Sequence, residues 1–113
     1  MKQWLILAIL VAFGAGEVAA FSKREIADAA YHWGRVDFAA KNCKRLGTNK
    51  VMRREVDQAL AKTGKKAWKS GYELGQSEAK EFLEGSGAEA FCELAWVFYG
   101  RNGQSVKNLL VRR

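Results

Sequence analysis

Several residue types that define common functional motifs are scarce or absent. The chain of 113 residues has no proline, one histidine and two cysteines. These are too few ligands for a zinc signature, and the sequence has no Cys-x-x-Cys motif, phosphate-binding glycine loop or calcium loop. The sequence therefore predicts neither a metal site nor a cofactor. Because no proline interrupts the chain, helices can continue until a glycine ends them.

The side chains that most often carry out catalysis are also poorly placed. His32 follows Asp28 by four residues, so the two can act on one helix face as a base and its orienting carboxylate. No serine or cysteine nucleophile is placed beside this pair by the sequence. Glu78, Glu81 and Glu84 are spaced like a solvated helix face, whereas paired-carboxylate chemistry needs two acids in different environments. We therefore expect that the protein is not an enzyme.

The first 20 residues have the pattern of a secretory signal peptide. Lys2 supplies a positive start, residues 4–13 form an unbroken apolar run, and the small residues at 18–20 fit a cleavage site. The apolar run is about half the ~20 residues that a membrane span needs, although an uncleaved anchor stays open as an alternative. The sequence predicts a signal peptide (1–20), one domain (21–113) without a stable transmembrane span, and export. The periplasm is the favoured destination, with the extracellular space as the alternative.

The two cysteines, Cys43 and Cys92, predict a structural disulfide. They form an even pair in a chain that we expect to be exported into an oxidising compartment. A small domain buries a modest share of its surface, so a covalent tie is valuable. Closing a loop of this length would stabilise the fold by about 4 kcal/mol in the chain-entropy model. A metal site and a reactive thiol are the alternatives, and two isolated cysteines fit both less well.

The order of caps, apolar positions and glycines predicts an all-α fold. Ser22 and Glu25 have the spacing of a capping box, which begins the first helix. The predicted elements are helices from Ser22 to about Arg45, from Thr48 or Asn49 to Thr63, from Lys65 to Leu83, and from a second capping box at Ser86 and Glu89 to Gly100, then a short helix over 106–110. We therefore expect a small bundle of four main helices plus a short C-terminal helix, tied by one disulfide (Cys43–Cys92).

Two features predict how these helices pack. The stretch from Phe91 to Gly100 is apolar on nearly every side, which predicts that it is the central packing element. Gly71 and Gly75 lie four residues apart in the third helix, where each costs about 1 kcal/mol relative to alanine. We expect another helix to approach closely at these glycines, and the helix at Phe91–Tyr99 is the expected neighbour. A ligand that approaches the backbone there is the alternative.

The charges are distributed unevenly along the chain. Residues 41–72 hold ten basic and two acidic residues, whereas residues 73–100 hold six acidic residues and one basic residue. A basic segment of this kind can attract an anionic partner, although a solvated, solubilising face is the alternative. The candidate binding residues of this basic surface, within 41–69, are Lys50, Arg53, Arg54, Lys62, Lys65, Lys66 and Lys69.

These features together predict an exported helical protein that works by binding. Its expected partner is an anionic envelope component or an acidic protein, and export to the periplasm makes nucleic acid a poor candidate. The plan of a short, exported, helical chain with one long-range disulfide is similar to that of the small acid-stress chaperones of the bacterial periplasm. That resemblance implies a stress chaperone as an alternative function. An inhibitor of an envelope enzyme is a further alternative.

Overall fold

The computed structural model describes residues 21–61 and 64–113, so the predicted signal peptide and Lys62 lie outside it. The elements in this part are α2 (Lys23–Asn42), β1 (Leu46–Thr48), α3 (Lys50–Val56), a π-helical turn η1 (Asp57–Ala61), α4 (Lys65–Ser86), α5 (Ala88–Tyr99) and β2 (Leu110–Arg112). The predicted small helical bundle is confirmed, with a two-stranded sheet added to it. Among the described residues, no helix combines the length and the apolar character that a membrane span requires.

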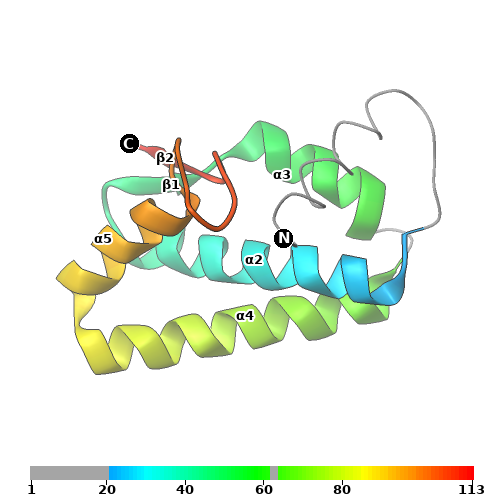
Figure 1. Cartoon of the computed structure of the whole chain (residues 1–113), viewed down its shortest axis with the longest axis horizontal. Helices are drawn as coiled ribbons and strands as arrows, with labels where there is room; N and C mark the ends of the chain where they lie inside the picture. The colour runs from blue at the N-terminus through cyan, green and yellow to red at the C-terminus, as the bar shows by residue number, and fades with distance from the viewer. Residues whose placement is uncertain (1–20, 62–63) are drawn as a thin grey trace.

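Helix α2 is the central element of the fold (Figure 1). Its start follows from the predicted capping box, because the Ser22 hydroxyl accepts from the Glu25 N–H at 3.1 Å while the Glu25 carboxylate accepts from the Ser22 N–H at 2.9 Å. Trp33 and Val36 are fully buried in the middle of the helix. Helix α2 contacts α4, α5 and β1. The prediction that the stretch from Phe91 to Gly100 is central was therefore wrong.

Helix α5 lies at the periphery, with one face buried, Cys92, Trp96 and Phe98 partly buried against the core, and the remaining side exposed. Phe91, Ala95 and Tyr99 recur every fourth residue and are buried, whereas Val97 is 41% exposed. The predicted disulfide is confirmed, and it joins Cys43 to Cys92 with 5.8 Å between their Cα atoms. The tie therefore connects the end of α2 to the first half of α5.

Glycines allow α4 to lie directly against α2. A Cβ atom on Gly71 would lie 2.1 Å from the carbonyl oxygen of Ala27, and one on Gly75 would lie 2.1 Å from that of Tyr31. Both distances are shorter than any real Cβ contact, so the two backbones meet only because these side chains are absent. The predicted close approach is confirmed, but the neighbour is α2 rather than α5. The pairing also shows that α2 and α4 run in the same direction (Figure 1).

The C-terminal segment forms turns and a strand instead of the predicted short helix. Val106, Leu109 and Leu110 are buried, so this segment does dock on the core. A helix is interrupted because Asn108 has a left-handed backbone, with φ of 66°, and its N–H donates to the carbonyl of Gly100 at 2.7 Å. Strand β2 then pairs with β1 in antiparallel register, which brings the chain end beside the end of α2.

Candidate functional site

Arg53, one of the predicted binding residues, is occupied inside the protein. Its guanidinium donates to a carboxylate oxygen of Asp37 and, at 3.1 Å, to Asp57. Asp37 also accepts from the hydroxyls of Thr48 at 3.0 Å and Tyr72 at 2.5 Å. Burial, together with the hydrogen bond to the Asp37 carboxylate, raises the pKa of Tyr72 to about 12. Asp37 is therefore the centre of a polar network that ties α3, β1 and α4 to α2.

Aromatic rings complete the surroundings of Arg53. Its guanidinium carbon lies 5.7 Å from the ring centroids of Trp33 and Trp68 and 5.4 Å from that of Tyr72. Burial opposes the charged form, but the hydrogen bonds and attraction of Asp37 and Asp57 outweigh it and raise the pKa of Arg53. The residue is held as a cation between three helices, and we assign it a structural role.

The other predicted binding residues divide between two helices. Lys50 and Arg54 are exposed one turn apart on α3. Lys65, Lys66 and Lys69 are exposed at the start of α4, which begins at the opposite end of α3 (Figure 1). Lys62 lies outside the described residues. The structure thus places Lys50 and Arg54 together and locates the three lysines of α4 on a separate element.

Strand pairing brings C-terminal cations beside the start of β1, which precedes α3, because Arg112 lies opposite Leu46 and the Arg113 N–H donates to the carbonyl of Arg45. We call the following exposed residues of the β1, α3 and C-terminal segments the cationic side: Lys44, Arg45, Lys50, Arg54, Arg101, Lys107, Arg112 and Arg113. The carboxylates in these segments are Glu55 and Asp57, and Asp57 is paired with Arg53. Helix α4, with most of the exposed glutamates, lies across α2 from α3 (Figure 1). The C-terminal cations were absent from the predicted surface because nothing in the sequence showed that β2 pairs with β1.

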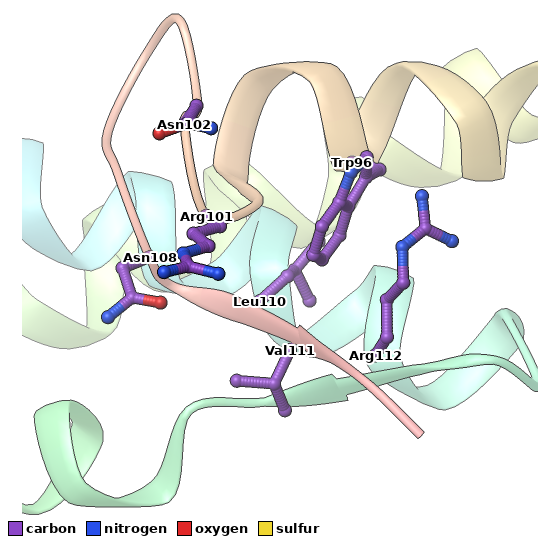
Figure 2. Close-up of a pocket in the computed structure, with 7 residues that line it drawn as sticks. All are labelled: Trp96, Arg101, Asn102, Asn108, Leu110, Val111 and Arg112. Atoms are coloured by element: carbon purple, nitrogen blue, oxygen red, sulfur yellow. The ribbon is translucent and has the colours of Figure 1, made fainter.

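A hollow of about 460 Å³, which we call the Trp96 hollow, opens on the cationic side (Figure 2). It is lined by Trp96, Arg101, Asn102, Asn108, Leu110, Val111 and Arg112. The guanidinium carbon of Arg112 lies 4.2 Å from the Trp96 ring centroid, and Arg101 stands on the other side of that ring (Figure 2). None of these described lining residues is acidic, so the hollow suits an anion.

A second, wider hollow of about 1120 Å³ shares Trp96 and Arg112 with the first. Its lining includes the disulfide, Leu46 and Val97, together with charges of both signs from Lys44, Arg45, Glu89 and Glu93. The mixed charges make this hollow less selective for one sign of ligand. Trp96 therefore separates a cationic hollow from a largely apolar groove.

The catalytic candidate His32 is buried, and its Nδ1 atom lies 2.9 Å from the hydroxyl oxygen of Tyr99 on α5. Burial raises the pKa of Tyr99. Both cysteines are in the disulfide, so neither supplies a thiolate nucleophile. Within residues 21–61 and 64–113, no three His, Cys, Asp or Glu residues are grouped so that they could hold a metal ion. This region can be described as a packed polar contact between α2 and α5.

No family model, curated protein or solved structure matches this chain. A function must therefore be argued from the site itself.

Proposed function

We propose that this chain is an exported binding protein that engages an anionic envelope component or an acidic protein through its cationic side. The observation that carries the proposal is the grouping of eight exposed cations, from segments far apart in sequence, beside the β1–β2 pair. Concentrated positive charge attracts polyanions and speeds their association. Within this surface, Lys50 and Arg54 are the predicted residues that we expect to contact the partner first.

The proposed export is supported by two separate features. The disulfide between Cys43 and Cys92 is a bond that persists in oxidising compartments such as the periplasm. The pattern of residues 1–20 is typical of a cleaved secretory signal. Amino-terminal sequencing of the protein recovered from the envelope fraction tests this, and the expected first residue is Phe21.

The binding proposal is tested by affinity capture from envelope extract at low and high salt. We expect Lys50→Glu with Arg54→Glu to abolish the salt-sensitive capture, because two attractive charges become repulsive. The matched control is Lys23→Glu with Lys80→Glu, which changes the net charge equally at exposed positions outside the cationic side. Equal capture by the wild type and the Lys50/Arg54 variant would contradict the proposal.

A stress chaperone is the second candidate, because the wider hollow presents apolar surface that includes Val97. A chaperone of this kind would expose further apolar surface in acid and hold unfolded proteins there. Dye binding between pH 7 and pH 2 discriminates the two functions. A rise in dye binding with prevention of aggregation favours the chaperone, and a flat response removes it.

A further inference from the structure

We propose that the Trp96 hollow binds an acidic saccharide unit, meaning a sugar ring that carries a carboxylate or a phosphate. The inference rests on the proposed function, because Arg101 and Arg112 belong to the cationic side. It deepens that function by naming the chemistry of the anionic ligand. The charge, the ring and the hydroxyl groups of such a ligand each have a counterpart among the residues that line the hollow.

The two arginines of the hollow select an anion. Arg101 comes from the turn after α5 and Arg112 from β2, and neither forms an ion pair with a carboxylate of the described residues. Arg112 is stacked on Trp96, and a stacked guanidinium keeps the N–H donors in its own plane for a carboxylate or phosphate. Because the lining contains no acidic residue, nothing within the hollow competes for these donors.

Trp96 supplies part of the wall of the hollow. Arg112 lies against its indole, with the guanidinium carbon 4.2 Å from the ring centroid, and Gly100 packs on the ring-fusion atoms, since a Cβ atom there would lie 2.6 Å from Cδ2. The part of the indole that these two groups leave open borders the hollow and offers a sugar ring an apolar contact. A ring placed there would bring its acidic substituent toward an arginine.

Asn102 and Asn108 supply groups that match hydroxyls. Each amide both donates and accepts hydrogen bonds, as a sugar hydroxyl does. Asn108 is held by its backbone, because its N–H donates to Gly100 and its carbonyl accepts from the Asn49 amide at 2.9 Å. The hollow, of about 460 Å³, is open to solvent, so a ligand there would keep part of its surface exposed. The small aliphatic share of the lining, Leu110 and Val111, disfavours a lipid chain.

The first test is a titration of the purified protein with glucuronate, glucose 6-phosphate, glucose, acetate and inorganic phosphate. The NMR signal of the Trp96 indole N–H reports binding in each titration. We expect saturable shifts with glucuronate and glucose 6-phosphate. Glucose, acetate and phosphate should bind at least about tenfold more weakly, because each lacks the charge or the ring. Equal binding of acetate or phosphate would reduce the hollow to a general anion site, and no binding of either acidic sugar would overturn the proposal.

Variants locate the binding. Trp96→Leu removes the ring and Arg101→Gln removes the charge, and each should weaken glucuronate binding at least about tenfold. Arg24→Gln is the matched control, because it removes an exposed arginine of α2 that belongs neither to the hollow nor to the cationic side, and it should leave glucuronate binding unchanged. Circular dichroism shows whether each variant is folded. Unchanged binding by folded Arg101→Gln, or a loss with Arg24→Gln equal to that with Arg101→Gln, would overturn the inference.

Failure of this inference is distinguishable from failure of the proposed function. If glucuronate and glucose 6-phosphate do not bind while envelope capture stays sensitive to salt and to Lys50→Glu with Arg54→Glu, the hollow assignment is overturned and the cationic side remains supported. If both sugars bind at Trp96 while capture is insensitive to the Lys50/Arg54 variant, the hollow assignment is supported and the wider surface is not.

Discussion

Arg53 and Arg112 both lie over aromatic rings, yet their surroundings are opposite. Arg53 is half-buried among three rings and is paired with Asp37 and Asp57. Arg112 is exposed over Trp96, beside a hollow whose described lining contains no carboxylate. The difference shows that burial and a carboxylate within reach decide whether an arginine stabilises the fold or remains available to a ligand.

The same contrast separates two regions of the molecule. Around Asp37 and Arg53, the packed helices α2 and α4 meet α3 through ion pairs and through one buried and two partly buried rings. Around Trp96 and Arg112, turns and two short strands carry exposed cations and open hollows. Four perturbations, given in order of decreasing effect on stability, test this division.

Loss of the disulfide should have the largest effect, because Cys43 and Cys92 connect the two regions. Cys92→Ser should lower the free energy of unfolding by about 4 kcal/mol, since the unfolded chain regains the freedom of a long loop. Thermal unfolding under oxidising conditions measures this loss. Reductant should destabilise the wild type and leave the variant unchanged, and a wild type indifferent to reductant would contradict the account.

Closing the glycine contact should have the next largest effect. Gly75→Ala places a methyl group against the backbone of Tyr31, so we expect a loss of about 3 kcal/mol. Gly85→Ala is the control within α4, because a Cβ there meets nothing within 4 Å and alanine favours a helix by about 1 kcal/mol. Urea unfolding of both variants gives the two values. Equal effects would show that α2 and α4 are not in close contact.

Removal of the Arg53 partner should destabilise the fold less than the glycine change. Asp37→Ala leaves a half-buried cation without its main carboxylate, and we expect a loss of about 2 kcal/mol because partial exposure moderates the penalty. Arg112→Ala removes an exposed cation and should cost less than about 1 kcal/mol. Chemical denaturation measures both. The contrast fails if Arg112→Ala is as damaging as Asp37→Ala.

Tyrosine ionisation should have the smallest effect near neutral pH, because it destabilises the fold only at high pH. Burial is the largest cause that raises the pKa of each of the three tyrosines, Tyr31, Tyr72 and Tyr99, and the pKa of Tyr72 is about 12. The stability from neutral Tyr72 is therefore complete below pH 10 and is lost as the pH rises to about 12. Spectrophotometric titration of the folded protein should show that no tyrosine loses its proton near pH 10, the ordinary pKa of this side chain being about 10. Tyr72→Phe should reduce the loss of stability in that range.

Features that depend on nearby residues were predictable from the sequence. The capping box of Ser22 and Glu25 needs only a spacing of three, and it forms as expected. The same spacing at Ser86 and Glu89 was wrong as a prediction, because Ser86 still belongs to α4 and Gly87 is the N-cap of α5. The pairing of Cys43 with Cys92 followed from there being two cysteines in a chain with a predicted export signal. The spacing of Gly71 and Gly75 indicated a close contact, but spacing along one helix does not identify the helix that approaches.

Features that depend on tertiary contacts were not predictable. The apolar composition of Phe91–Tyr99 predicted a central helix, but composition does not show which apolar residues remain exposed, as Val97 does. Arg53 and Arg54 are adjacent in sequence, yet one turns toward Asp37 and the other toward solvent. The pairing of β2 with β1 places Arg112 in the candidate site. This pairing could not be predicted, because strands of three residues have a weak sequence pattern.

The contrast between the two arginines is tested most directly by NMR of the arginine Nε–H groups, before and after addition of glucuronate. We expect slow solvent exchange at Arg53, whose Nε–H donates to Asp57, and fast exchange at Arg112. Glucuronate should shift the signals of Arg101 and Arg112 and leave that of Arg53 in place. Fast exchange at Arg53, or a glucuronate-induced shift at Arg53 with none at Arg112, would contradict the account.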